Sequence, residues 1–227
     1  MDIHWKQEYT GDMEVRQRDG VTYLSYPRLE RESAIVHGFS TRLGGVSEGC
    51  LGSMNLSFSR GDNLENVLEN YRRISRAIGF PVESIVTSDQ THTTNVRQVG
   101  KEDCGCGVLT PRTFHDIDGL ITNEPGVTLA TFYADCVPLY FYDPTHKAIG
   151  LSHSGWRGTV GNIAKATVEA MQKAYHTDPA DLIAAIGPSI CQDCYEVSED
   201  VIEQFRQAYP ETLHKNSSTG NPTESIS

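Results

Sequence analysis

One stretch of the sequence, two apolar runs on either side of a turn, constrains the fold more than any other. The runs are Val137 to Tyr142 and Ala148 to Leu151, and the turn begins at Asp143-Pro144. This pattern is typical of two neighbouring strands of one sheet. Cys136 precedes the first run and His153 follows the second, so antiparallel pairing places the thiol and the imidazole at the same sheet edge. The sequence therefore predicts either a metal site or an activated thiol there.

Composition and charge exclude several classes of protein. No apolar run approaches the roughly 20 residues that a membrane span needs, and the N-terminal residues lack the apolar core of a signal peptide. We therefore expect a cytoplasmic protein with no membrane partner. The net charge of −11 argues against a nucleic-acid partner, because phosphates would repel the chain. A small polar or anionic substrate held by a few local arginines stays compatible with this charge.

The order of strand-like and helix-like segments predicts an α/β fold. We expect a mixed α+β fold in one domain, residues 1–213, with a central mixed β-sheet flanked by helices. No internal repeat and no linker divides this range. The polar residues 214–227 are predicted to be a poorly ordered tail.

Hydrophobic periodicity gives the individual elements. In the first clear helix, Val67, Tyr71, Ile74 and Ile78 share one face, and Gly79 ends it. The later helices are expected from Ile163 to about Tyr175 and after Ser198. Strands are expected at 21–26 (an edge strand), 34–41, 55–58, 85–88, 95–99, 118–122, 126–133 (a central strand) and 182–186.

Two glycine-rich segments carry an arginine and are candidates for anion binding. Arg42 begins the loop that ends at Gly49, where backbone amides can approach a ligand closely. An ordinary wide turn with a solvated arginine is the alternative interpretation. Arg157 precedes a second glycine-rich segment at the start of a helix, where free amides and the helix dipole favour an anion.

Six cysteines allow a rival metal site. The pairs Cys104-Gly-Cys106 and Cys191-Gln-Asp-Cys194 together offer four sulfur atoms to a structural zinc. The two spacings differ, and the first is not the usual pair separated by two residues. We therefore favour incidental loop thiols.

Three residues, His92, Cys136 and His153, stand out as candidate ligands. His92 lies at a junction between two predicted strands, where it can face a cleft or serve as a surface or capping histidine. The three are separated by 44 and 17 residues (136 − 92 and 153 − 136), which is not a zinc signature by itself.

Several ordered motifs resemble those of the bacterial laccase-domain family, which is also called polyphenol oxidase-like and is associated with purine nucleoside phosphorylase activity. The resemblance extends from Ala34 to the last helix. The matching motifs are Ser40 to Ser47, Asn55-Leu56, Gly61-Asp62, Glu65 to Val67 with Asn70, Gln90-Thr91-His92, Asp118-Gly119-Leu120, Ala134 to Pro138, His153 to Gly158, Ile186 to Ile190 and Cys194 to Val197.

The resemblance implies a zinc enzyme that acts on purine nucleosides. It implies Zn²⁺ bound by His92, Cys136 and His153, with copper as an alternative metal. The implied reaction is phosphorolysis of adenosine, inosine and guanosine, with deamination of adenosine as a companion activity. Three nitrogen and sulfur ligands suit such a zinc because they leave a fourth position open for reactants.

Further residues receive roles from their chemistry and position. We predict catalytic roles for Cys136, His153, Asp135 and Arg157, with Asp135 orienting a ligand histidine or the sugar. We predict that Arg42, Asn55 and Arg157 bind phosphate or substrate. Relatives continue beyond the last helix into a further helix and strand, so we expect this chain to be short at its C-terminus and part of the pocket to be affected.

Three rival functions remain. Copper-dependent phenol oxidation is the first, although eight scattered histidines do not suit several coppers. The second is an amidase-type hydrolase acting on peptidoglycan precursors, with Cys136 as nucleophile and His153 as base. The third is a metal-stabilised binding protein without catalysis. The sequence does not indicate the oligomeric state.

Overall fold

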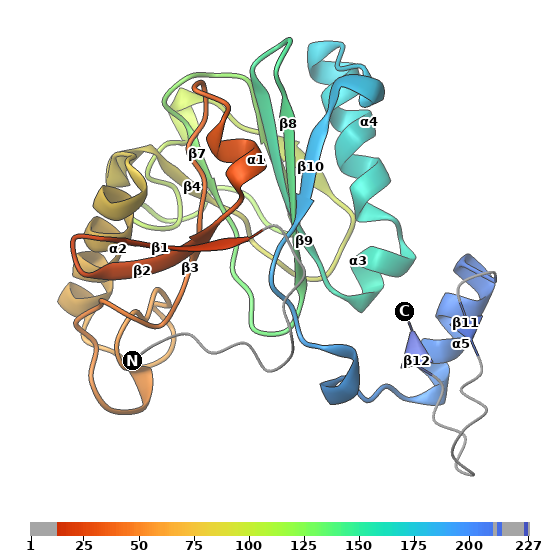
Figure 1. Ribbon diagram of the computed structural model, residues 1–227, viewed down its shortest axis with the longest axis horizontal. Helices are drawn as coiled ribbons and strands as arrows, with labels where there is room; N and C mark the ends of the chain where they lie inside the picture. The colour runs from red at the N-terminus through yellow and green to blue at the C-terminus, as the bar shows by residue number, and fades with distance from the viewer. Residues whose placement is uncertain (1–12, 211–212, 215–224, 227) are drawn as a thin grey trace. The chain divides into compact units, whose positions relative to one another are not determined.

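Figure 1 shows the computed structural model, which describes residues 13–210, 213–214 and 225–226. The chain divides into two compact units. Among the described residues, the first unit contains 13–86, 103–111 and 125–128, and the second contains 87–102, 112–124 and those from 129 onward.

The first unit contains a three-stranded antiparallel sheet. Its order is β1 (Glu14–Arg18), β2 (Val21–Ser25) and β3 (Phe39–Ser40). The predicted edge strand at 21–26 is therefore wrong in its position, because β2 pairs on both sides. The short helix α1 (Pro27–Glu30) follows β2.

Two predicted strands of this unit are shorter or absent. The strand predicted at 34–41 is reduced to β3, since the Ile35 amide donates to the Glu32 carbonyl in a turn. The strand predicted at 55–58 does not form. There the side-chain oxygen of Asn55 accepts from the Ser57 amide at 3.0 Å, and such local bonds favour turns over a ladder.

The helix α2 (Leu64–Ile78) confirms its predicted span and its buried face. The Asn63 side chain caps its start by accepting from the Glu65 amide, and Gly79 ends it in the left-handed conformation with φ of 105°. Val67, Tyr71 and Ile74 are buried. Part of this face packs in a core cluster that includes Val21, Met54, Ile74 and Ala77.

The second unit is built on a five-stranded mixed sheet of order β10-β8-β9-β6-β5. Only β5 and β6 are parallel; the other neighbours are antiparallel. The predicted mixed α/β fold is thus confirmed. The strands are β5 (Val96–Gln98), β6 (Gly119–Thr122), β8 (Val137–Asp143), β9 (Ala148–Ser154) and β10 (Ile183–Ile186).

The predicted hairpin is confirmed, and it forms the middle of this sheet. β8 and β9 pair antiparallel from Val137 opposite Ser154 to Asp143 opposite Ala148. The strand predicted at 126–133 is not central. Only β7 (Thr128–Ala130) forms, and it pairs with β4 (Ile85–Thr87) in a two-stranded sheet. The strand ends there because the amide and the carbonyl of Phe132 both hydrogen-bond to the Gln90 side chain.

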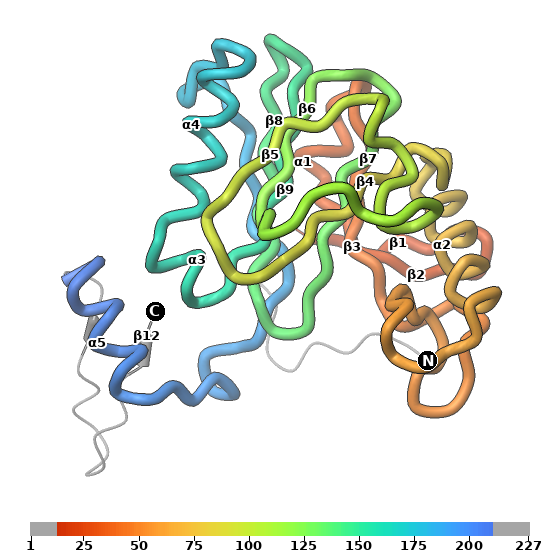
Figure 2. The backbone as a smooth tube through the Cα atoms, turned by 180° about the vertical axis from the view of Figure 1, so that it is seen from behind, coloured from red at the N-terminus to blue at the C-terminus, as the bar shows by residue number. Residues whose placement is uncertain are grey.

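Helix α4 (Ile163–Tyr175) covers one face of the five-stranded sheet (Figure 1). Met171 and Thr167 of this helix are fully buried against the sheet. Gly150 of β9 permits this close packing, since a Cβ there would lie 3.1 Å from the Met171 sulfur. Figure 2 shows the same sheet and helix from behind.

The remaining elements are short or lie late in the chain. The helix α3 (Trp156–Val160) was not predicted, and α5 (Glu199–Ala208) begins after Ser198 as expected. Within the part of the chain that the structure describes, no helix has the length and apolar character of a membrane span. The other elements are η1 (Gly49–Leu51), η2 (Val82–Ser84), η3 (Lys101–Asp103), η4 (Pro179–Asp181), η5 (Gln192–Cys194), β11 (Leu213–His214) and β12 (Ser225–Ile226).

Candidate metal centre

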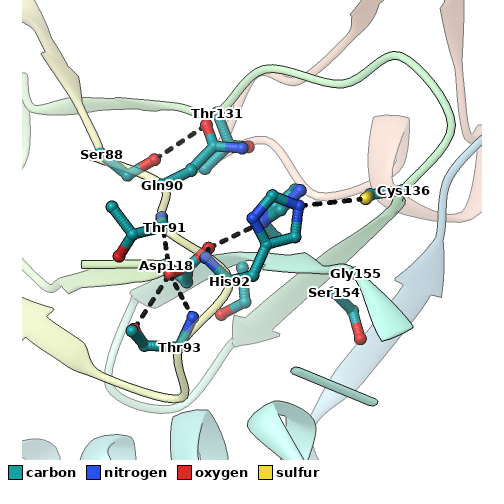
Figure 3. Close-up of polar contacts among 12 residues, drawn as sticks. Ser88, Gln90, Thr91, His92, Thr93, Asp118, Thr131, Cys136, Ser154 and Gly155 are labelled. Carbon is teal, nitrogen blue, oxygen red and sulfur yellow. Dashed lines mark hydrogen bonds and ion pairs between the residues drawn. The ribbon is translucent and has the colours of Figure 1, made fainter. Parts of the chain in front are cut away.

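The structure brings His92, Cys136 and His153 together in the second unit. One ligand atom from each lies within 4.8 Å of the others. Figure 3 shows the contact between Cys136 and His92, in which the Sγ atom is 3.8 Å from Nε2. The rings of His92 and His153 meet edge to face, with their centroids 4.9 Å apart. His153 is buried, Cys136 is partly buried and His92 is exposed. Two imidazoles and a thiol that face one another, with one side open to solvent, could bind a metal ion.

Strand pairing positions two of the three side chains. Pro138 lies opposite His153 in the β8–β9 ladder, so Cys136 reaches the same end of the sheet. His92 comes from the loop between β4 and β5 and joins them from outside the ladder. Its backbone has a φ of 67°, in the left-handed region that residues with a Cβ seldom adopt.

A buried carboxylate, that of Asp118, lies behind the two histidines. Its Oδ1 accepts from His153 Nδ1 at 2.8 Å and from the His92 amide at 3.1 Å. Its Oδ2 accepts from the amides of Thr91 and Thr93 and from the Thr93 hydroxyl (Figure 3). An ionised carboxylate only accepts, so Nδ1 of His153 carries the proton and Nε2 has a lone pair available for a metal.

The same contacts explain the acidity of Asp118. Burial raises the pKa of this carboxyl, because a charge loses its hydration there. The hydrogen bonds from His153, Thr93 and Thr91 together outweigh burial and hold the pKa at about 2. Asp118 is therefore an anion at neutral pH.

The structure places a carboxylate other than the predicted one beside His153. Asp135 was expected to orient a ligand histidine or the sugar, whereas the carboxylate that accepts from His153 Nδ1 is that of Asp118, and Asp135 is exposed. Strand pairing explains the difference, because β6 lies beside β9 and the His153 amide donates to the Asp118 carbonyl at 2.7 Å. A role for Asp135 toward His92 or the sugar stays a prediction.

Gln90 holds the segment that leads to Cys136. Its side-chain amide donates to the Phe132 carbonyl at 2.6 Å and accepts from the Phe132 amide at 2.7 Å. Ser88 donates to the same Gln90 oxygen at 3.1 Å. Farther along, the Tyr133 hydroxyl donates to the Ser152 carbonyl, and its ring lies 5.6 Å from that of His153. Sequence reasoning did not assign these supporting roles to Gln90 and Tyr133.

Gly155 lines the centre because no side chain fits there. A Cβ at this position would lie 2.6 Å from His92 Cδ2 and 3.1 Å from the Cys136 sulfur. Both distances are shorter than ordinary van der Waals contacts. The absence of a side chain therefore leaves the space that His92 and Cys136 occupy.

Without a metal, the surroundings of Cys136 disfavour its thiolate. Burial raises the pKa of this thiol first, and the negative charges of Asp135 and Asp118 raise it further. Burial also raises the pKa of the Tyr133 phenol. A free thiol in this environment is a weak nucleophile, whereas a bound divalent cation favours the deprotonated sulfur.

The predicted phosphate ligands are spread over the chain. The Arg157 guanidinium is exposed on α3 and stacks over the Trp156 ring at 4.2 Å. Arg42 and Asn55 belong to the first unit, where Arg42 donates to the Gly52 carbonyl and Asn55 donates to Asp62. Their binding of phosphate or substrate stays a prediction.

The four-sulfur site has no support among the described residues. Within those residues, the single group of three or more His, Cys, Asp or Glu side chains with ligand atoms close enough for one ion is His92, Cys136 and His153. Cys104 and Cys106 belong to the first unit, whereas Cys191 and Cys194 belong to the second.

Comparison with known proteins identifies the family. Residues 36–225 match the family described as multi-copper polyphenol oxidoreductase laccase. The chain belongs to this family. A purine nucleoside phosphorylase of Bacteroides thetaiotaomicron is 39% identical over 81% of this chain and 68% of its own length. The protein named adenosine deaminase RL5, from an unknown prokaryotic organism, is 36% identical over 77% of this chain and 67% of its own length.

A further relative has a solved structure. The purine nucleoside phosphorylase YlmD of Geobacillus stearothermophilus is 40% identical over 77% of this chain. The match spans 64% of the length of that relative. The crystal structure of YlmD from this organism has a TM-score of 0.78 at 33% identity and covers 93% of this chain and 78% of its own.

Proposed function

We propose that the chain is a zinc-dependent purine nucleoside phosphorylase that acts on adenosine, inosine and guanosine, with adenosine deamination as a second activity. The observation that carries this proposal is that one ligand atom each of His92, Cys136 and His153 lies within 4.8 Å of the other two. The names of the relatives support the substrate class, because several are purine nucleoside phosphorylases and one is an adenosine deaminase.

The donors of this cluster suit zinc. His92 Nε2, Cys136 Sγ and His153 Nε2 are the atoms proposed to hold it, and the Asp118 contact fixes which His153 nitrogen is available. Three protein ligands are typical of catalytic zinc, which keeps a position for reactants. When bound, zinc supplies a Lewis acid that polarises an oxygen ligand and lowers the pKa of water.

Phosphorolysis needs an anion held beside the ribose. A phosphate oxygen forms a bond with the anomeric carbon while the bond from that carbon to the purine nitrogen breaks. The purine leaves with the electron pair and takes up a proton. Arg157 is proposed to bind this phosphate, because its guanidinium offers several N–H donors and is exposed on α3. Arg42 and Asn55 are further proposed phosphate or substrate ligands.

One observation favours a second candidate function. Cys136 Sγ lies 3.8 Å from His92 Nε2, and a thiol next to an imidazole is also the nucleophile and base pair of a cysteine hydrolase. The predicted base, His153, keeps its role in this alternative, because the bond of its Nδ1 to Asp118 leaves a lone pair on Nε2, and His92 Nε2 is a second candidate base. The raised pKa of the Cys136 thiol opposes this function, because little thiolate forms near neutral pH.

The assay that tests the proposal measures release of free purine base from adenosine and inosine, with and without phosphate. We expect base and ribose 1-phosphate only with phosphate, and loss of activity after chelation. Cys136→Ala should be inactive, whereas Cys50→Ala, an exposed cysteine of the first unit, serves as the matched control. Base release without phosphate would show hydrolysis. Activity that survives chelation but not thiol alkylation would support the cysteine hydrolase.

Reconstitution of metal-free protein with either zinc or copper tests the phenol oxidase named in the family description. The proposal predicts nucleoside phosphorolysis with zinc and no phenol oxidation of comparable rate with copper. Multicopper chemistry uses several metal centres with many imidazoles, whereas the cluster among the described residues contains only His92 and His153. Faster phenol oxidation by the copper form would favour the oxidase.

A further inference from the structure

We propose that Asp118 is a positioning residue that holds two of the proposed ligands, His92 and His153, in their metal-binding arrangement at the same time. The inference rests on the proposed metal site and adds a residue that contacts no metal itself. Asp118 is fully buried, and its carboxylate accepts five hydrogen bonds. None of these five donors is a lysine or arginine; they come from residues 91–93 of the loop and from His153.

The first effect of Asp118 is on the backbone that presents His92. The amides of Thr91, His92 and Thr93 all donate to this carboxylate, at 3.1, 3.1 and 2.7 Å. Successive amides around a left-handed residue form a concave nest that binds an anion. His92 is that left-handed residue. The Asp118 carboxylate therefore supplies the anion that stabilises an otherwise disfavoured backbone conformation, which directs the His92 ring toward Cys136 and His153.

The second effect is on the protonation of His153. Its Nδ1 lies 2.8 Å from Asp118 Oδ1, and the carboxylate can only accept. The proton is thereby kept on Nδ1, and Nε2 stays free to bind a metal. Partners of this kind typically improve metal affinity by 10–100-fold. Because one carboxylate contacts both histidines, we expect its replacement to lower the affinity for the metal by about 100-fold, the upper end of this range.

Asp118→Asn separates this role from simple packing, because asparagine has the same shape but only one acceptor oxygen. If the amide nitrogen replaces Oδ2, it faces the amides of Thr91 and Thr93, donor against donor. If it replaces Oδ1, it faces the His92 amide and donates to His153 Nδ1. The proton of His153 then moves to Nε2, the nitrogen that the metal needs. Either orientation disturbs one of the two ligands.

Asp116→Asn is the matched control. Asp116 is exposed two residues earlier in the same loop, and its carboxylate accepts from the Thr91 hydroxyl at 2.9 Å. It makes no side-chain bond to either histidine in the contacts that the structure describes. Its φ of 56° is a conformation that asparagine tolerates well, so the substitution adds no strain. The control removes the same charge at nearly the same place.

The experiment measures two properties of the metal-free and zinc-loaded proteins. Nitrogen-15 NMR of the metal-free chain reports which nitrogen of His153 carries the proton, and competition with a chromophoric chelator reports the affinity for Zn²⁺. We expect Nδ1–H in the wild type and in Asp116→Asn. Asp118→Asn should shift the His153 proton toward Nε2 or alter the His92 amide resonance, and should weaken Zn²⁺ binding about 100-fold.

The outcomes separate this inference from the proposed function. Wild-type affinity for Zn²⁺ in Asp118→Asn, or Nε2–H of His153 in the metal-free wild type, would overturn the role of Asp118. The wild-type spectrum decides the matter even if Asp118→Asn does not fold. A wild type with Nδ1–H but no affinity for Zn²⁺ would overturn the proposed function and leave the positioning of both histidines by Asp118 in place.

Discussion

Gly155→Ala places one methyl group inside the candidate metal centre. The backbone accepts alanine, since φ is −74° and ψ is 175°. The new Cβ would lie 2.6 Å from His92 Cδ2, which is about 0.9 Å short of the roughly 3.5 Å of a normal carbon contact. The His92 ring must yield, because its amide is fixed by Asp118. Overpacking of this kind costs about 1–3 kcal/mol of stability.

The effect on metal binding should exceed the effect on folding. Ligand distances in metal sites hold to about ±0.2 Å, so a shift of about 0.9 Å removes His92 as a ligand. We expect Zn²⁺ affinity to fall by at least about 100-fold, the upper end of the loss caused by removing a hydrogen-bond partner of a ligand. Chelator competition measures the affinity, and urea denaturation of the metal-free protein measures stability.

Gly158→Ala is the matched control for this prediction. Its Cβ would meet the His153 carbonyl oxygen at 3.5 Å and the Thr93 carbonyl oxygen at 3.6 Å, which are ordinary contacts. We expect this variant to bind Zn²⁺ as the wild type does. Equal, undiminished affinity in Gly155→Ala would refute the placement of His92 beside this glycine in the metal centre.

Three further predictions concern other parts of the chain. Joint replacement of Cys191 and Cys194 by serine should leave zinc content unchanged in elemental analysis, and its loss would favour the sulfur-rich site. Asn70→Ala should lower the free energy of unfolding by roughly 3–5 kcal/mol in urea, because this fully buried amide makes four hydrogen bonds; a loss below 1 kcal/mol would contradict this role. The Arg16 hydrogen bond lowers the pKa of Glu30 from 4.5 to about 2. Its stabilisation is therefore complete above pH 4.5 and disappears as the pH falls through 2, so Glu30→Gln should flatten the acid limb of the stability curve, and an unchanged limb would count against it.

Local patterns predicted the elements whose signals lie within the element itself. The helix over Val67, Tyr71 and Ile74 has a continuous apolar face, a capping asparagine and a terminal glycine, and it forms as predicted. The hairpin around Asp143-Pro144 also forms, because adjacent strands with a short turn need no distant partner.

Other elements depended on partners elsewhere in the chain. The run 126–133 has the composition of a central strand. The strand nevertheless ends at Ala130, because the backbone amide and carbonyl of Phe132 hydrogen-bond to the Gln90 side chain. The segment 34–38 is apolar enough for a strand, but a turn from Glu32 uses its hydrogen bonds. Gln90 lies 42 residues before Phe132, so the sequence around Phe132 carries no signal that this side chain competes with the ladder.

In the candidate site, too, local patterns predicted some residues, and the contacts of distant segments determined another. Pairing rules brought Cys136 and His153 to one edge, and family motifs added His92. Adjacency in sequence suggested Asp135 as the partner of a histidine, whereas the sheet places Asp118 there through the pairing of β6 with β9. The Asp-Gly step before a buried strand is the signal in the sequence that marks Asp118, and it becomes informative only once the strand order is known.

The central claim is that two imidazoles and one thiolate bind a single zinc ion. The most direct measurement is X-ray absorption of the purified wild type together with the zinc content of Cys136→Ala. We predict one zinc per chain, with one sulfur and two imidazole nitrogens among its ligands, and loss of stoichiometric zinc in the variant. A spectrum without a sulfur ligand, or a full equivalent of zinc in Cys136→Ala, would contradict the claim.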